Sequence, residues 1–236
     1  MKIELLYHTP LWVASKAIRK CWASEDKSDS HYDLCEIDFI CGTKDRALIE
    51  RVGNQNKHKS TLEHLVYTFD IDGISRACLQ EVARHRLASY SVKSTRYTLK
   101  ELKELHLKYT DRYELIDGEE KFISTEYDKK LFSKFVVFTD NEFNNGAIAR
   151  SLVHLCAVLR SNVSNDIAKY CLPEAYKTSL VMTINARSLQ NFLELRSSKH
   201  ALWEIQQLSN EVYNALPEEH KYLFKEYHKG LEDENK

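Results

Sequence analysis

Hydrophobic and polar positions follow two periods along the first part of the chain. Apolar residues alternate with polar ones over residues 1–7, which predicts a strand, and recur at helical spacing over 10–22, which predicts a helix. A second strand is expected at 66–71, followed by a helix over 74–86. Residues 89–97 are predicted to be extended.

The second part of the chain has mainly the helical period. Residues 127–172 are predicted to be mostly helical, with breaks near 144–146 and near 161–162, and 179–184 is a short β-like run. A last long helical region is expected from about residue 185 to 216. The apolar positions expected to be buried are Leu152, Leu155, Cys156 and Leu159 in the first region, and Leu189, Phe192, Leu193, Leu202, Ile205, Leu208 and Val212 in the last.

Strands scattered among dominant helices indicate an α+β fold without the regular alternation of a doubly wound sheet. The 236 residues include only 6 Gly and 3 Pro, which disfavours a turn-rich β sandwich or barrel. Nothing along the chain resembles a linker. We therefore expect a mostly helical single domain with a small mixed or antiparallel sheet, covering 1–229 and followed by a polar tail at 230–236.

Net charge and cysteine content limit the cellular compartments and the binding partners that are expected for this chain. The formal net charge of -1 gives no global field that would recruit nucleic acid or an anionic membrane. No apolar run is long enough to span a bilayer, and Glu4, His8 and Pro10 interrupt the stretch that a signal peptide would need. The 6 cysteines form no C-x-x-C pair. We expect a cytoplasmic protein with free thiols.

A basic segment with interleaved hydroxyl groups is the first candidate for chemistry. Guanidinium forks and hydroxyl groups together suit a phosphorylated ligand such as a nucleotide, and a nucleotide- or RNA-binding module remains an alternative. The cations at its start also lie near a predicted helix end, where the helix dipole favours them in any case. The segment contains Arg84, Arg86, Lys93 and Arg96, with Ser89, Ser91, Ser94 and Thr95 between them.

A second polar segment contains two pairs of residues at a spacing of four. Arg187 with Asn191, and Arg196 with His200, each share a helix face. One straight helix would point the two pairs in nearly opposite directions, at about 100° per residue. Either the helix restarts at 197–198 or the two pairs serve different sites. A solvated polar face is the simpler alternative.

Two histidines flank a third candidate segment. Ser60 and Glu63 have the spacing of a capping box at the start of a short helix. His58 and His64 are six residues apart, which does not place them on one helix face. A metal hydrolase built on these two residues and His85 is a further alternative.

Taken together, the three segments resemble the flavin-dependent thymidylate synthases. The signature of that family, R-H-R followed by seven residues and a serine, corresponds to Arg84-His85-Arg86 and Ser94, and continues into Arg96-Tyr97. A second family segment, N-A-R-S-L-x-N-F-L-x-L-R with a following histidine and A-x-W-E-I, matches 185–196, His200 and 201–205. The third, H-x-T/S-x-x-E-H, matches 58–64.

The resemblance implies a homotetramer of α+β subunits, with FAD at the interfaces and active sites shared between chains. The implied reaction converts dUMP to dTMP. Methylenetetrahydrofolate supplies the methylene group, and reducing equivalents from NADPH pass through FAD. The resemblance implies no metal ion, no nucleic acid and no membrane.

The resemblance also implies roles for individual residues. Arg196 would lie beside the uracil ring and favour ionisation at N3, because a fixed cation stabilises the anion of a weak acid. The residues implied for dUMP are Arg84, Ser94, Arg96, Lys169 and Arg196, and those implied for FAD are Ser60, Arg84, His85, Arg86, Asn185, Arg187, Asn191 and His200.

Three positions depart from the family pattern. Ser91-Val92 replaces an Asn-Glu pair, so contacts through those two side chains would be lost. Lys169 replaces an arginine and keeps the charge without the bidentate fork. Glu81 replaces a glutamine, and an inward-pointing carboxylate beside an anionic ligand must be protonated, bridged, or used through its backbone alone.

Overall fold

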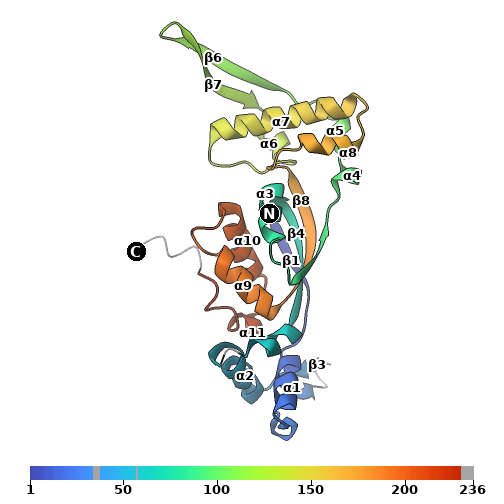
Figure 1. The fold of residues 1–236 in the computed structure, drawn as a ribbon, viewed down its shortest axis with the longest axis vertical. Helices are drawn as coiled ribbons and strands as arrows, with labels where there is room; N and C mark the ends of the chain where they lie inside the picture. Colours follow the sequence, from blue (N-terminus) through green and yellow to red (C-terminus); the bar gives the residue numbers. More distant parts are fainter. Residues whose placement is uncertain (34–37, 57, 230–236) are drawn as a thin grey trace. The chain divides into compact units, whose positions relative to one another are not determined.

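The computed structural model describes residues 1–33, 38–56 and 58–229, so the predicted tail lies outside the described residues. Contacts within the chain group it into two compact units, which are described separately (Figure 1). The first comprises Met1–Asp72, Glu81–Ser91 and the chain from Leu180 onwards, and the second comprises Gly73–Gln80 and Val92–Ser179. The single domain over 1–229 stays a prediction.

A four-stranded sheet in the order β1-β4-β8-β5 carries most of the predicted strands. Strand β1 pairs antiparallel with β4, and Leu5 lies opposite Phe69. The strands are β1 (Lys2–His8), β4 (Val66–Ser75), β8 (Lys177–Asn185) and β5 (Ala88–Val92). Together with two antiparallel hairpins and many helices, this sheet confirms the expected α+β class.

The core of the first unit lies between this sheet and two helices. In β4 the fully buried residues Tyr67, Phe69 and Ile71 alternate with half-buried ones, so one face of the strand is completely covered. Figure 1 places α9 (Ala186–Arg196) and α10 (Trp203–Asn214) beside the strands. Their predicted apolar positions are buried, except Leu202, which is 37% exposed because it precedes the first turn of α10.

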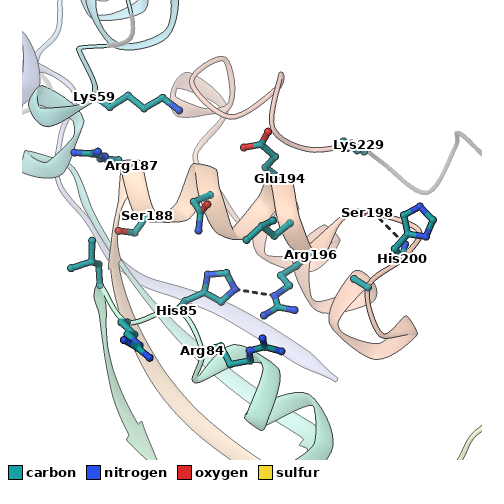
Figure 2. A pocket seen from close by; sticks show the side chains of 15 residues that line it. Lys59, Arg84, His85, Arg187, Ser188, Glu194, Arg196, Ser198, His200 and Lys229 are labelled. Atoms are coloured by element: carbon teal, nitrogen blue, oxygen red, sulfur yellow. Dashed lines mark hydrogen bonds between the residues drawn. The ribbon is translucent and has the colours of Figure 1, made fainter.

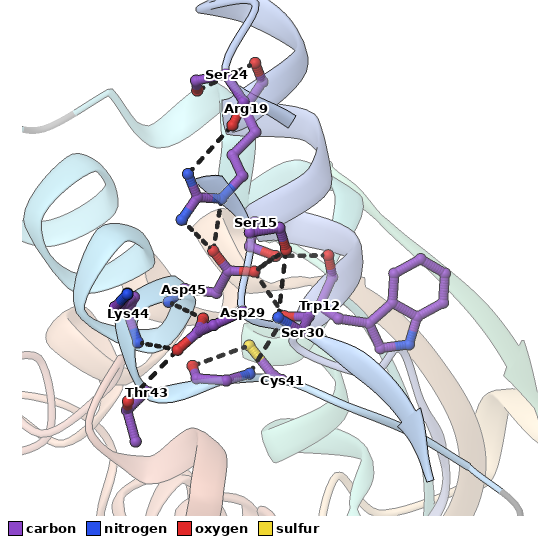
Figure 3. Close-up of polar contacts among 12 residues, drawn as sticks. Trp12, Ser15, Arg19, Ser24, Asp29, Ser30, Cys41, Thr43, Lys44 and Asp45 are labelled. Atoms are coloured by element: carbon purple, nitrogen blue, oxygen red, sulfur yellow. Dashed lines mark hydrogen bonds and ion pairs between the residues drawn. The ribbon is translucent and has the colours of Figure 1, made fainter. Parts of the chain in front are cut away.

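A buried ion pair joins the first two helices of this unit. Asp45 is fully buried, and its Oδ1 accepts a bond from Nε of Arg19 over 2.6 Å (Figure 3). Its Oδ2 accepts from the hydroxyl groups of Ser28 and Ser30, each over 2.6 Å. The elements of this region are α1 (Trp12–Cys21), η1 (Glu25–Lys27), β2 (His31–Asp33), β3 (Asp38–Ile40), α2 (Thr43–Glu50) and η2 (Arg51–Gln55), and α11 (Glu218–Lys221) lies near the end of the chain.

The second unit is a helical layer with a long hairpin. The hairpin pairs β6 (Tyr109–Ile116) with β7 (Glu119–Tyr127) and extends beyond the end of α7 (Glu142–Arg160) in Figure 1. The apolar stripe predicted on α7 is buried and forms one core with Leu99, Phe132 and Tyr176. The remaining elements are α4 (Thr95–Thr98), α5 (Lys100–Lys103), α6 (Lys129–Phe132), α8 (Asn165–Ala168) and η4 (Lys169–Cys171).

The helix break predicted at 144–146 is wrong, because α7 runs through these residues without interruption. Asn141 caps the helix by accepting a bond from the backbone N–H of Asn144 over 2.9 Å. A Cβ added to Gly146 would lie 2.6 Å from Oγ1 of Thr125. The glycine therefore marks a close approach between helix and hairpin. The break near 161–162 is confirmed.

Two predicted boundaries around the basic segment are also wrong. Helix α3 spans Arg76–Val82 and stops four residues before Arg86. The hydroxyl group of Tyr90 donates to the carbonyl oxygens of Val82 and His85, over 3.0 and 2.7 Å, and so closes the turn after the helix. The extended segment predicted over 89–97 ends at Val92, because α4 begins shortly afterwards.

The capping box at Ser60 and Glu63 is wrong as well. The segment is a 3-10 helix, η3 (Lys59–His64), which begins before Ser60 and has no side-chain cap. Glu63 instead forms an ion pair with Arg187, with 2.7 Å between Oε1 and Nη1. A tertiary partner therefore outcompetes the local bond that the pattern suggested.

Five cysteines lie in the described residues, and all of them are free thiols as expected. Cys41, Cys78 and Cys156 are buried, whereas Cys21 and Cys171 are exposed. Among the described residues, no helix has both the length and the apolar composition that crossing a membrane requires. The cytoplasmic location stays a prediction.

Candidate functional site

A cavity of about 1110 Å³ opens in the first unit between the turn after α3 and one face of α9 (Figure 2). Side chains from three distant stretches of sequence meet around it. Its lining consists of Lys59, Arg84, His85, Arg86, Leu87, Arg187, Ser188, Asn191, Glu194, Leu195, Arg196, Ser198, His200, Ala201 and Lys229.

The charge of this cavity is strongly positive although the whole chain is nearly neutral. Six of the lining residues are Lys or Arg, whereas Glu194 is the single carboxylate among them. A concave surface with this balance attracts anions, and guanidinium groups match the oxygen pairs of phosphates. The cavity therefore favours a phosphorylated ligand.

Arg196 is the most firmly held cation in the lining. Its Nε donates to Nε2 of His85 over 2.9 Å, its Nη1 donates to Oε2 of Glu81 over 2.6 Å, and its Nη2 donates to the Glu81 carbonyl oxygen over 3.0 Å. The side chain is only 13% exposed. Three of the five N–H donors of the guanidinium group are thus engaged, and the group is fixed in the cavity wall.

His85 is buried beneath this contact, with its ring edge against Phe192 at a centroid distance of 5.0 Å. Burial, together with the adjacent cation of Arg196, lowers the pKa of His85 to about 4. The imidazole is therefore neutral near pH 7. Because Nε2 accepts the bond from Arg196, the proton of the neutral ring lies on Nδ1.

The carboxylate of Glu81 is bridged by two arginines, which is one of the three possibilities that follow from its place in the sequence. Besides its bonds to Arg196, Oε1 lies 3.4 Å from Nη1 of Arg84. The Arg84 side chain is 71% exposed, so this second contact is much looser. The two arginines therefore differ in freedom although they share one counter-ion.

Helix α9 presents further polar groups to the cavity from one face. Arg187 and Asn191 lie on its first turns, and the helix ends at Arg196, before the turn that carries His200. The single helical region expected over about 185–216 is therefore wrong, because α9 ends at Arg196 and the next helix, α10, begins only at Trp203 rather than at 197–198. Because the chain turns there, both spaced pairs reach the same cavity.

Several predicted site residues lie outside this lining. Asn185 caps α9, where its Oδ1 accepts a bond from the Ser188 backbone N–H over 2.9 Å, and Ser60 lies on η3 next to Lys59. Ser94, Arg96 and Lys169 belong to the second unit. There Arg96 forms an ion pair with Asp166, with 2.8 Å between Nε and Oδ1.

Other lining residues were missing from the sequence prediction. Ser188, Asn191 and Leu195 are spaced by three and four residues, and this helical spacing was the available signal for Ser188 and Leu195. Leu195 is 53% exposed, which places an apolar side chain on a polar face of α9. Lys59 and Lys229 carried no local signal, because only the fold brings them to the cavity.

The metal alternative gains no support from the part of the chain that the structure describes. Within those residues, no three or more His, Cys, Asp or Glu side chains gather in a way that could hold a metal ion. His58, which precedes η3, and His64, its last residue, are exposed and absent from the cavity lining.

Comparison with known proteins gives consistent matches over nearly the whole chain. The family model described as thymidylate synthase complementing protein matches residues 4–220. A flavin-dependent thymidylate synthase of Wolinella succinogenes is 54% identical over 224 residues, covering 95% of this chain and 97% of the relative. One from Campylobacter jejuni is 52% identical over 233 residues, covering 98% and 100%.

A solved structure has the same fold. It is thymidylate synthase X from Helicobacter pylori with FAD and dUMP, which matches with a TM-score of 0.81 and 45% sequence identity. The match covers 98% of this chain and 100% of that chain.

Proposed function

The chain belongs to the flavin-dependent thymidylate synthases, and from this premise we propose that it binds FAD and dUMP and converts dUMP to dTMP. We further propose methylenetetrahydrofolate as the one-carbon donor and NADPH as the source of reducing equivalents. The observation that carries the proposal is the cavity with six Lys or Arg residues against one carboxylate. Both FAD and dUMP carry phosphate groups.

The donor set of the cavity fits FAD. A diphosphate needs cationic and neutral donors together, and the lining offers Arg187, Asn191 and His200 within one concave surface. The volume of about 1110 Å³ lies slightly above the usual range for small-molecule sites, as a dinucleotide requires. FAD supplies hydride chemistry when bound. The residues proposed to hold it are Ser60, Arg84, His85, Arg86, Asn185, Arg187, Asn191 and His200.

Arg196 is proposed to act on the pyrimidine. Its guanidinium group is held by three bonds, so it can present a fixed positive charge without reorganising. A fixed cation beside N3 of uracil stabilises the ring anion and activates the ring for attack on the one-carbon unit. Neutral His85 accepts from Arg196 and keeps its orientation.

The phosphate of dUMP is proposed to bind Arg84 and Arg96, with Ser94 and Lys169 as further contacts. The exposed and loosely paired Arg84 can turn toward a phosphate at small cost. Arg96 must exchange its ion pair with Asp166 for the ligand, or share it. Lys169 contributes a point charge without a bidentate fork.

We also propose a homotetramer in which two chains contribute to one active site. An Arg96→Ala variant and an Arg196→Ala variant, each inactive alone, should regain activity when they are mixed and allowed to exchange subunits. Recovery would show that the two arginines serve one site from different chains. If no mixture recovers although co-purification through a tag on one variant shows exchange into mixed tetramers, the shared site is wrong.

The experiment that tests the function is spectroscopic. Purified protein should have the visible absorption of bound flavin, and NADPH should bleach it faster when dUMP is present. Product analysis should then find dTMP only when methylenetetrahydrofolate is added. Protein that takes up no FAD, or that forms dTMP without flavin, would contradict the proposal.

A further inference from the structure

Glu81 is a carboxylate placed between two arginines that are proposed to bind the same substrate. It lies at the end of α3 and is 30% exposed, and it contacts Arg196 through both its side chain and its carbonyl oxygen. Its other carboxylate oxygen lies 3.4 Å from Arg84. An acidic group here opposes the binding of anions in an otherwise basic cavity.

The two arginines are held to very different extents. Arg196 has three bonds and is 13% exposed, so its charge is balanced at close range by Glu81. Arg84 has two long contacts to the same carboxylate, from Nη1 to Oε1 over 3.4 Å and to Oε2 over 3.5 Å, and is 71% exposed. A mobile, exposed arginine can follow a phosphate, whereas a fixed arginine suits a group whose position must be exact to a fraction of an ångström.

We propose that Glu81 is a positioning residue that fixes Arg196 for the pyrimidine ring. As the counter-ion of Arg196 it also balances that charge, so that Arg84 is the arginine that binds the phosphate of dUMP. The inference rests on the proposed function and assigns a role to a side chain outside the cavity lining. Two properties of Glu81 are separable. Its acceptor oxygen orients Arg196, and its charge lowers the affinity of the cavity for anions.

Two substitutions separate these properties. Glu81→Gln keeps an acceptor for Nη1 of Arg196 and removes the charge. In the FAD-loaded enzyme it should tighten dUMP binding by about threefold to tenfold and steepen the loss of binding with salt, with a smaller fall in kcat than Glu81→Ala causes. Glu81→Ala removes the acceptor as well, so kcat should fall by about tenfold or more because the guanidinium group loses its orientation.

Glu194→Gln is the matched control, because it removes the single carboxylate of the cavity lining, which Figure 2 shows pointing away from Arg84 and Arg196. It should change dUMP affinity less than Glu81→Gln does. Equal affinity changes in the two Gln variants would overturn the role of the counter-ion, and a kcat in Glu81→Ala equal to that of the parent would overturn the role in positioning. If Glu81→Ala does not fold, the affinity and salt dependence of Glu81→Gln against the control decide the outcome.

The outcomes also separate this inference from the proposed function. If the parent enzyme binds no dUMP and forms no dTMP, the function itself is wrong. If the parent is active and both Glu81 variants behave like the control, the function stands and the role of Glu81 is wrong. Isothermal titration with dUMP, and with inorganic phosphate as a minimal anion, measures the binding directly.

Discussion

The Nε atom of Arg196 donates a hydrogen bond of 2.9 Å to Nε2 of His85, although 111 residues separate the two along the chain. The bond requires a neutral histidine, because a protonated ring has no acceptor. The orientation of Arg196 therefore depends on His85 being uncharged. The consequences can be measured in stability and in catalysis.

The first prediction concerns pH. The pKa of His85 is lowered to about 4 in the folded protein from an ordinary value of 6.5, so between these values the unfolded chain binds more protons. Stability is therefore expected to fall as the pH falls from about 6.5 to 4. Once the pH is well below 4, the titration of His85 alone should have lowered the free energy of unfolding by on the order of 3 kcal/mol.

The measurement is urea unfolding of the parent and of His85→Gln across this pH range. The difference in unfolding free energy between the two proteins should shrink as the pH falls, because the variant has no titrating ring at this position. His220, whose pKa burial lowers to about 3, is present in both proteins and cancels in the comparison. A difference that stays constant from pH 7 to pH 4 would contradict the prediction.

The second prediction is that Arg196→Ala abolishes dTMP formation and leaves flavin binding intact. The fixed cation is lost, and one substituted position among many cavity donors does not remove the affinity for FAD. Arg196→Lys should rescue little, because a lysine cannot reproduce three directed bonds. Flavin absorbance and single-turnover product analysis check both variants, and normal turnover in either would refute the assigned role.

The third prediction is that Arg84→Ala acts on affinity. Because this side chain is 71% exposed and loosely paired, its removal should raise the KM for dUMP by about tenfold and change kcat little. Arg112→Ala is the matched control, since this arginine is 63% exposed and lies on the hairpin. Steady-state kinetics at constant ionic strength distinguish the two, and an unchanged KM in Arg84→Ala removes that residue from the site.

The fourth prediction concerns the buried carboxylate of Asp45. Burial acts to raise its pKa, but bonds from Ser28, Ser30 and Arg19 outweigh that effect and hold the pKa below its ordinary value. Asp45→Asn should lower the free energy of unfolding by about 3 kcal/mol, because it leaves Arg19 buried without a counter-ion. The exposed Asp26→Asn should change stability by less than about 0.5 kcal/mol. Chemical denaturation compares them, and equal stabilities would show that the network is dispensable.

Hydrophobic periodicity was sufficient to predict a strand or helix where a single local pattern dominates the segment. The strand predicted over 1–7 and the stripe on α7 are confirmed. The stripe on α7 is buried, whereas in β1 Ile3 and Leu5 are only half-buried between exposed neighbours, and Tyr7, beyond a register shift after Leu5, is 57% exposed. Polar and glycine residues within a helical pattern predicted helix breaks less well. The Asn-Asn-Gly run at 144–146 predicts a break in the helix, but Gly146 instead allows a close contact with Thr125, which lies on a hairpin that no pattern in the sequence predicts.

The sequence by itself determined the family, the helical character of the chain, and the residue types that the chemistry requires, since these are encoded locally in motifs and spacing. Only the tertiary structure decided how those residues are used. It paired Arg196 with Glu81 and His85, engaged Asn185 as a helix cap, and brought Lys59 and Lys229 to the cavity. The physical reason is that burial and ion pairing depend on neighbours in space, and these come from stretches that no local pattern connects.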